Sequence, residues 1–182
     1  MAVFDRGARF GAVSVFNHWV IAVAVIAMLA IGLLMEEFPK GPERNFVVNL
    51  HKSIGIFVLL YGAWRVLWRL LWRFPDDVAT MPGWQKTAAS AVHWFLLAAI
   101  LVMPLSGYIG STTAGYPVSF FGLFSLPALG EAKWLSSIAW EVHEILANIL
   151  IAVIVLHVLA ALKHHLIDRD GTLRRMLGRD PV

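Results

Sequence analysis

Two histidines lie fourteen residues apart, at positions 143 and 157, inside a long apolar segment. An α-helix turns about 100° per residue, so fourteen residues turn about 1400°, about 40° short of four full turns. His143 and His157 therefore share one face of such a helix, about 21 Å apart along its axis. A neutral imidazole can bind a metal through one ring nitrogen and form a hydrogen bond through the other. The spacing predicts two separate sites on one helix.

The composition of the chain is typical of a membrane protein. Of its 182 residues, 59% are hydrophobic, and the mean hydropathy is +0.71. Four apolar runs reach the roughly 20 residues that a bilayer-spanning helix needs, and they cover residues 12–35, 50–72, 88–110 and 138–162. The first run contains His18 and is longer than a signal-peptide core, so we expect it to be retained. We predict an all-α membrane protein, a four-transmembrane-helix bundle that forms a single domain over residues 1–182.

The cationic residues are distributed unevenly between the two sides of this bundle. Of fifteen Lys and Arg residues, those on one side are Lys40, Arg44, Lys52 and Lys133. The positive-inside rule then places both termini in the cytoplasm and these four on the outer, periplasmic side of a bacterial inner membrane. The net charge of +3 and the pI of about 9.5 follow from this bias and from contact with anionic lipid, so no nucleic-acid partner is expected. The chain has no cysteine, which excludes thiolate ligands and covalently attached haem.

Histidines inside membrane spans are costly unless they have partners, and only histidines at the same depth in the membrane can be partners. His51 is the one mate available at the depth of His143 on the periplasmic side, whereas His157 has two candidates, His18 and His93. We prefer His18 because it lies further inside its apolar run. Hydrogen bonding between helices is the simpler explanation for a single histidine. Pairing at two depths instead favours two bis-imidazole sites, and hence two haems stacked within the bundle.

Other residues share faces with these histidines. Small side chains there could let a flat macrocycle approach, or could serve ordinary helix packing; they are Gly32, Gly55 and Gly62. Arg65 lies fourteen residues after His51 and could meet haem propionates at the cytoplasmic site or reach lipid phosphates. For Arg69, one turn further on, lipid phosphates are the expected partners.

The order of several motifs resembles that of the bacterial cytochrome b561 family over nearly the whole chain. The motifs are FNHW (16–19), LHKSIG (50–55), WRVLWR (64–69), AVHW (91–94), LVMPLSGYI (101–109), YPVSFFGLF (116–124), EVHE (141–144), LHVLAALKHH (156–165) and DRDG (168–171). The resemblance implies a four-helix integral membrane protein with two b haems as cofactors. It also implies haem ligands at His18 with His157 and at His51 with His143, and it matches His93 and His164 to family histidines that are not axial ligands.

The resemblance also implies a function, because the family's electron carriers include ubiquinone and its members include a superoxide oxidase. We therefore expect electron transfer between a periplasmic donor such as superoxide and ubiquinone, with His51 and Lys52 as the catalytic candidates. Lys52 beside His51 could attract a small anion, or it could be one of several scattered solubilising charges. Lys163 and His164 follow His157 on or near its face and could contact a quinone or lipid headgroups.

Two other classes of function remain open at this point. The chain could be a membrane anchor that relays electrons to or from a separate dehydrogenase or hydrogenase subunit. A histidine-lined transporter is a third possibility, but the spans lack the carboxylates that such pathways use. A homo-oligomer is also open, and the aromatic segment 116–127 is expected as a loop at the periplasmic interface that could cover the haem.

Overall fold

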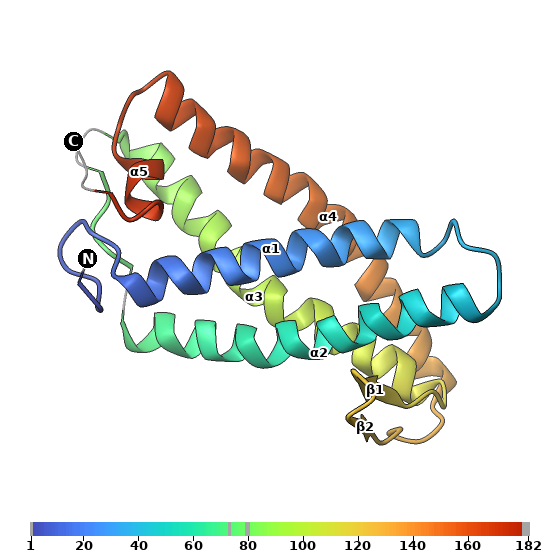
Figure 1. Ribbon diagram of the computed structural model, residues 1–182. Helices are drawn as coiled ribbons and strands as arrows, with labels where there is room; N and C mark the ends of the chain where they lie inside the picture. Colours follow the sequence, from blue (N-terminus) through green and yellow to red (C-terminus); the bar gives the residue numbers. More distant parts are fainter. Residues whose placement is uncertain (1, 73, 79–80, 180–182) are drawn as a thin grey trace.

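The computed structural model describes residues 2–72, 74–78 and 81–179, and within them the protein is mostly helical (Figure 1). The four long helices are α1 (Ala12–Leu34), α2 (Pro42–Leu71), α3 (Gly83–Thr113) and α4 (Lys133–Leu166). A short hairpin of β1 (Val118–Phe120) and β2 (Phe124–Leu126) connects α3 to α4, and a short helix α5 (Thr172–Met176) follows α4. All four long helices are long and apolar enough to cross a membrane. The predicted fold class is therefore confirmed, with the hairpin as an addition.

The helices extend beyond the apolar runs that predicted them. Helix α2 begins at Pro42 instead of residue 50, and α4 covers 133–166 instead of 138–162. At 1.5 Å per residue, the 30 residues of α2 are about 45 Å long, more than the hydrocarbon core of about 30 Å. Hydropathy marks the part of a helix that lies in hydrocarbon, whereas helical hydrogen bonding continues into the headgroup region. Pro42 starts a helix readily because its missing N–H would be unpaired there.

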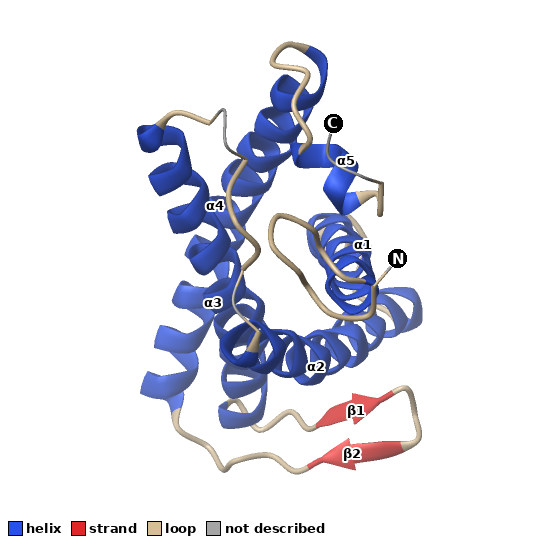
Figure 2. Ribbon diagram, turned by 90° about the vertical axis from the view of Figure 1, so that its left-hand side faces the viewer, coloured by secondary structure: helices blue, strands red, loops and turns tan. Residues whose placement is uncertain are grey.

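The four helices follow one another around the bundle in chain order (Figure 2). Helix α3 packs closely against both α4 and α2, and α2 packs against α1. Pro104 has no N–H, so the helical partner of the Ile100 carbonyl is missing. A Cβ on Gly62 would lie 3.2 Å from that carbonyl oxygen, which explains why α2 has glycine at this contact. In the described part of the chain, α1 and α4 are not among the helix pairs that pack closely.

The segment before α1 and helix α5 lie at the same end of the bundle (Figure 1). The guanidinium of Arg175 donates to the carbonyl oxygens of Ala8 and Asp76, both at 2.8 Å. The indole N–H of Trp19 donates to the carbonyl of Met176 at 2.8 Å. The amino-terminal segment, the connection between α2 and α3, and α5 therefore close one end of the bundle together.

Arg69 belongs to the same end and does not reach lipid, so that expectation is wrong. Its side chain is 8% exposed and forms a 2.9 Å ion pair with Asp5, which is equally buried. The guanidinium also donates to the hydroxyl of Ser14 at 3.1 Å. Asp5 in turn accepts the N–H of Gly11 and the hydroxyl of Ser14 at the start of α1. A buried carboxylate from the amino-terminal segment therefore keeps Arg69 inside the protein.

At the opposite end, the aromatic segment forms a hairpin instead of the expected loop. The strands are antiparallel, with Val118 opposite Leu126 and Phe120 opposite Phe124. The turn places Phe121 and Gly122 at φ values of 51° and 73°. Two successive positive φ values are the signature of a type I′ turn, which suits the twist of a hairpin.

Candidate functional site

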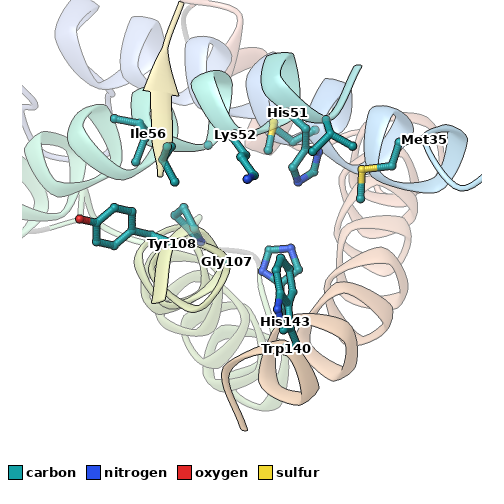
Figure 3. Close-up of a pocket in the computed structure, with 13 residues that line it drawn as sticks. Met35, His51, Lys52, Ile56, Gly107, Tyr108, Trp140 and His143 are labelled. Carbon is teal, nitrogen blue, oxygen red and sulfur yellow. The ribbon is translucent and has the colours of Figure 1, made fainter. Parts of the chain in front are cut away.

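Four histidines form two facing pairs between α4 and the first two helices. His18 on α1 faces His157 on α4 with 6.3 Å between ring centroids, and the planes of these rings are tilted by 52°. His51 on α2 faces His143 on α4, also with 6.3 Å between centroids. In Figure 3 the His51 and His143 side chains point toward each other across a pocket. The pairs are those preferred from sequence.

The separation within each pair can be compared with that of two imidazoles bound to one metal. A metal–imidazole nitrogen bond is about 2.0–2.1 Å long, and the ring centroid lies about 1.1 Å beyond the nitrogen. Two rings on opposite sides of one metal ion therefore have centroids about 6.3 Å apart. Both histidine pairs fit a haem iron bound between them. The distance between ring centroids is the same in the two pairs.

The ring of His143 is oriented by α3. Its Nδ1 lies 3.0 Å from the carbonyl oxygen of Met103 and 3.1 Å from the hydroxyl oxygen of Ser106. A carbonyl only accepts, so Nδ1 carries the proton and Nε2 keeps its lone pair for a ligand. A Cβ on Gly107 would lie 2.9 Å from Cε1 of the same ring. Residues 103–107 of α3 therefore form a fitted seat for His143.

The ring of His51 is held differently, by packing against α1. A Cβ on Gly32 would lie 3.3 Å from its Cε1, so the glycine makes room for the imidazole itself. From the sequence, Gly32 could let a macrocycle approach or serve helix packing, and the structure places it against the His51 ring. Among the described residues, no polar atom forms a hydrogen bond with the buried Nδ1 of His51. Gly55, in contrast, makes only an ordinary contact: its Cβ would lie 3.6 Å from Met28.

Arg65 and His93 lie beside the His18–His157 pair. The Arg65 guanidinium lies 3.4 Å from Nδ1 of His18, so this arginine does reach the site nearer the amino terminus. The ring of His93 lies 5.7 Å from that of His157 and stacks on Phe74 at 5.4 Å. His157 therefore has two histidine neighbours, as the depth argument allowed.

A pocket lies between His51 and His143 (Figure 3), and its walls come from all four long helices and from β1. It is lined by Met28 from α1, Met35 just after α1, Lys52 and Ile56 from α2, Gly107 and Tyr108 from α3, Trp140 from α4 and Val118 from β1. The lining is largely apolar, and Lys52 is its one cation among the described residues. The Lys52 ammonium also lies 5.8 Å from the centroid of the Tyr116 ring.

Comparison with known proteins identifies the family of the chain. The model of the prokaryotic cytochrome b561 family matches residues 9–179. The chain belongs to this family. It is 38% identical to cytochrome b561 homolog 2 of Escherichia coli K12, over 98% of this chain and 96% of the relative. It is 32% identical to homolog 1 of the same organism, over 94% and 98%. It is 27% identical to a Yersinia pestis protein named probable superoxide oxidase CybB, over 93% and 96%.

Membership of the cytochrome b561 family establishes membrane electron transfer and b haem as the cofactor. The family and the four candidate spans together make this a multi-pass bacterial membrane protein. Many large apolar side chains on the outer faces of the helices are exposed, as lipid-facing surfaces are. Contact with membrane lipid is therefore expected of this cytochrome.

Lys163 and His164 lie where α4 ends, but both are engaged by neighbouring acids. The Lys163 ammonium lies 2.6 Å from Asp168. The Nδ1 atom of His164 lies 2.9 Å from Asp168 and 2.8 Å from Asp170. Each side chain of this cytochrome would have to exchange a partner before it could bind a quinone.

Sequence reasoning missed Ser106 and Gly107 as neighbours of a candidate ligand. Both lie in the LVMPLSGYI motif that carried the family resemblance, and Pro104 just before them marks an irregular helix. The buried Ser106 hydroxyl also donates to the Met103 carbonyl at 2.8 Å. A proline followed by a small polar residue and glycine inside a span was the available signal.

Proposed function

We propose that this cytochrome b561 family member binds two b haems and transfers electrons across the membrane between a periplasmic donor and ubiquinone. His18 with His157 would ligate one haem, and His51 with His143 the other. One observation carries the proposal: both pairs have the same 6.3 Å ring separation, which fits one iron between two imidazoles. The proposal includes one four-helix domain over residues 1–182 with both termini in the cytoplasm.

His18 is the proposed mate of His157 in preference to His93. The ring of His93 lies 5.7 Å from that of His157, closer than the 6.3 Å that separates the rings in each of the two facing pairs. His93 is also stacked on Phe74, which gives its ring a separate packing role. His18 matches the separation found at the second pair, where no third histidine competes among the described residues.

Haem at these two sites would supply one-electron transfer. The protein's own groups hold the ligands in place. Met103 and Ser106 fix the protonated Nδ1 of His143, which directs Nε2 into the pocket. Arg65 beside His18 supplies a positive charge that suits haem propionates.

Superoxide is the proposed periplasmic donor. Lys52 lines the pocket between His51 and His143, and a cation at a pocket mouth raises the encounter rate of a small anion. A relative that is 27% identical bears the name probable superoxide oxidase. Two superoxide ions would each lose one electron and leave as O₂, and one ubiquinone would take up two electrons and two protons to become ubiquinol. Lys163 and His164, at the cytoplasmic end of α4, are the proposed quinone contacts.

The test uses the purified holoprotein in vesicles that contain ubiquinone. Superoxide generated outside should reduce the haems and then the quinone, and Lys52→Gln should slow haem reduction and weaken its dependence on salt. Lys133→Gln, at the same end of the bundle but outside the pocket lining, is the matched control and should change neither. A fully haem-loaded protein that superoxide does not reduce would refute the oxidase. The relay for a separate dehydrogenase or hydrogenase would then be the better proposal.

A further inference from the structure

Three consecutive residues of α2 contact the periplasmic hairpin or the pocket beneath it. His51 lines the pocket, and the ammonium of Lys52 lies 5.8 Å from the ring centroid of Tyr116, just before β1. Ser53 is 3% exposed and hydrogen-bonds the hairpin backbone. The helix turn that carries a proposed haem ligand is therefore connected to the hairpin by two neighbouring side chains.

The hydroxyl of Ser53 joins the middle of the first hairpin strand, and the turn that follows it, to α2. It accepts the backbone N–H of Phe121 at 3.0 Å. Its single proton can go to the carbonyl oxygen of Ser119 at 2.9 Å, or to that of Asn49 in its own helix at 2.8 Å. Phe121 has the positive φ of 51° that side-chain-bearing residues rarely adopt, so a hydrogen bond on its N–H fixes a costly turn.

The strand that Ser53 holds is also a wall of the pocket. Val118 in β1 is 2% exposed and lines the pocket together with His51 and His143. Leu123 at the tip of the hairpin, in contrast, is 78% exposed. One face of the hairpin therefore closes the pocket, and its tip is free of the protein.

We infer that Ser53 is a positioning residue whose hydroxyl fixes the β1–β2 hairpin as the wall that keeps water out of the pocket between His51 and His143. Without the hydroxyl, the hairpin opens and Val118 becomes accessible. The consequence for the haem rests on the proposed function. Water that enters the pocket stabilises the oxidised haem, which carries the extra positive charge, and so lowers the midpoint potential of that haem alone.

The absence of cysteine from the chain allows a clean accessibility test. Val118→Cys is introduced alone and together with Ser53→Ala, and the rate of reaction with a maleimide is measured in detergent or nanodiscs. Loss of a buried hydroxyl that bonds two backbone groups should raise the labelling rate of the Val118→Cys thiol about tenfold. Leu123→Cys should react rapidly with and without Ser53→Ala. The matched control is Ser136→Ala, which removes another buried hydroxyl, on the Gly110 carbonyl, at the same end of the bundle.

Unchanged labelling of Val118→Cys in the Ser53→Ala background would overturn the inference, as would an equal rise with Ser136→Ala. Hydrogen exchange on the unmutated protein gives a second measurement that needs no folded variant. The Phe121 amide should be protected, and exchange as fast as in an unstructured peptide would also overturn the inference. In the holoprotein, Ser53→Ala should lower one midpoint potential and leave the other in place; equal shifts in both would refute the role at the pocket. A chain without haem would contradict the proposed function but would leave the labelling result interpretable.

Discussion

Gly107 is the position where one added methyl group should damage one haem site and spare the other. A Cβ there would lie 2.9 Å from Cε1 and 3.1 Å from Nδ1 of His143, whereas ordinary contacts begin at 3.4 Å. The ring must therefore move by about 0.5 Å, and overpacking of this kind costs about 1–3 kcal/mol. Alanine stabilises a helix by only about 0.5–1 kcal/mol relative to glycine, so the cost of overpacking exceeds this gain. The net cost of roughly 1–2 kcal/mol predicts about tenfold weaker haem binding at the His51–His143 site.

Gly83→Ala is the matched control, because Gly83 is another glycine of α3 that lies outside the pocket lining, and a Cβ there would have nothing within 4 Å. This substitution should leave haem binding unchanged and stabilise the helix slightly. The assay is the transfer of haem from each variant to apomyoglobin, followed by the spectrum of the haem that remains. Equal haem loss from the two variants, or none from Gly107→Ala, would refute the seat described for His143.

Three further substitutions or conditions test other parts of the structure. Asp5→Asn removes the charge partner of the buried Arg69 and should destabilise the protein by about 3 kcal/mol, seen as a lower Tm; an unchanged Tm would show that the pair is not buried in solution. Ser106→Ala leaves the Met103 carbonyl to hold the His143 ring, so both haems should stay bound while one midpoint potential shifts. Loss of the haem at His143 would show that the Met103 carbonyl alone does not hold the ring. Burial alone would raise the pKa of Asp170, but hydrogen bonds from Thr172 and His164 hold it below its usual 3.8. The stability that this carboxylate contributes is therefore present above about pH 4 and lost below it. The protection of the Thr172 amide, measured against the exchange rate of an unstructured peptide at the same pH, should fall on acidification in that range but should not change with pH in Asp170→Asn.

The spans and the histidine pairs could be predicted because both depend on the fixed geometry of a helix. Residues fourteen apart share a face whatever surrounds them, which is why His143 and His157 were placed correctly relative to each other. The depth of a residue in an apolar run then restricts its possible neighbours to those on the same side of the membrane. Depth alone could not decide between His18 and His93, because both lie at similar depth and the structure brings both rings near His157.

The contacts that sequence reasoning missed depend on how helices approach each other. The seat of His143 is formed by the turn of α3 on both sides of Pro104, and nothing in the apolar pattern says which neighbour that turn will face. The Arg69–Asp5 pair joins residues 64 positions apart, and a membrane-facing arginine was the expectation from local sequence alone. The hairpin strands have three residues each, too few for an alternating pattern to be recognised.

The central claim is that iron is bound between imidazoles at two depths, and haem counting tests it most directly. The measurement is a dithionite-reduced minus oxidised spectrum with haem quantified per chain, for the unmodified protein and for His143→Ala, His18→Ala and His93→Ala. We expect two low-spin b haems in the unmodified chain, one in each of the first two variants, and two in His93→Ala. Retention of both haems by His143→Ala, or loss of one from His93→Ala but not from His18→Ala, would contradict the account.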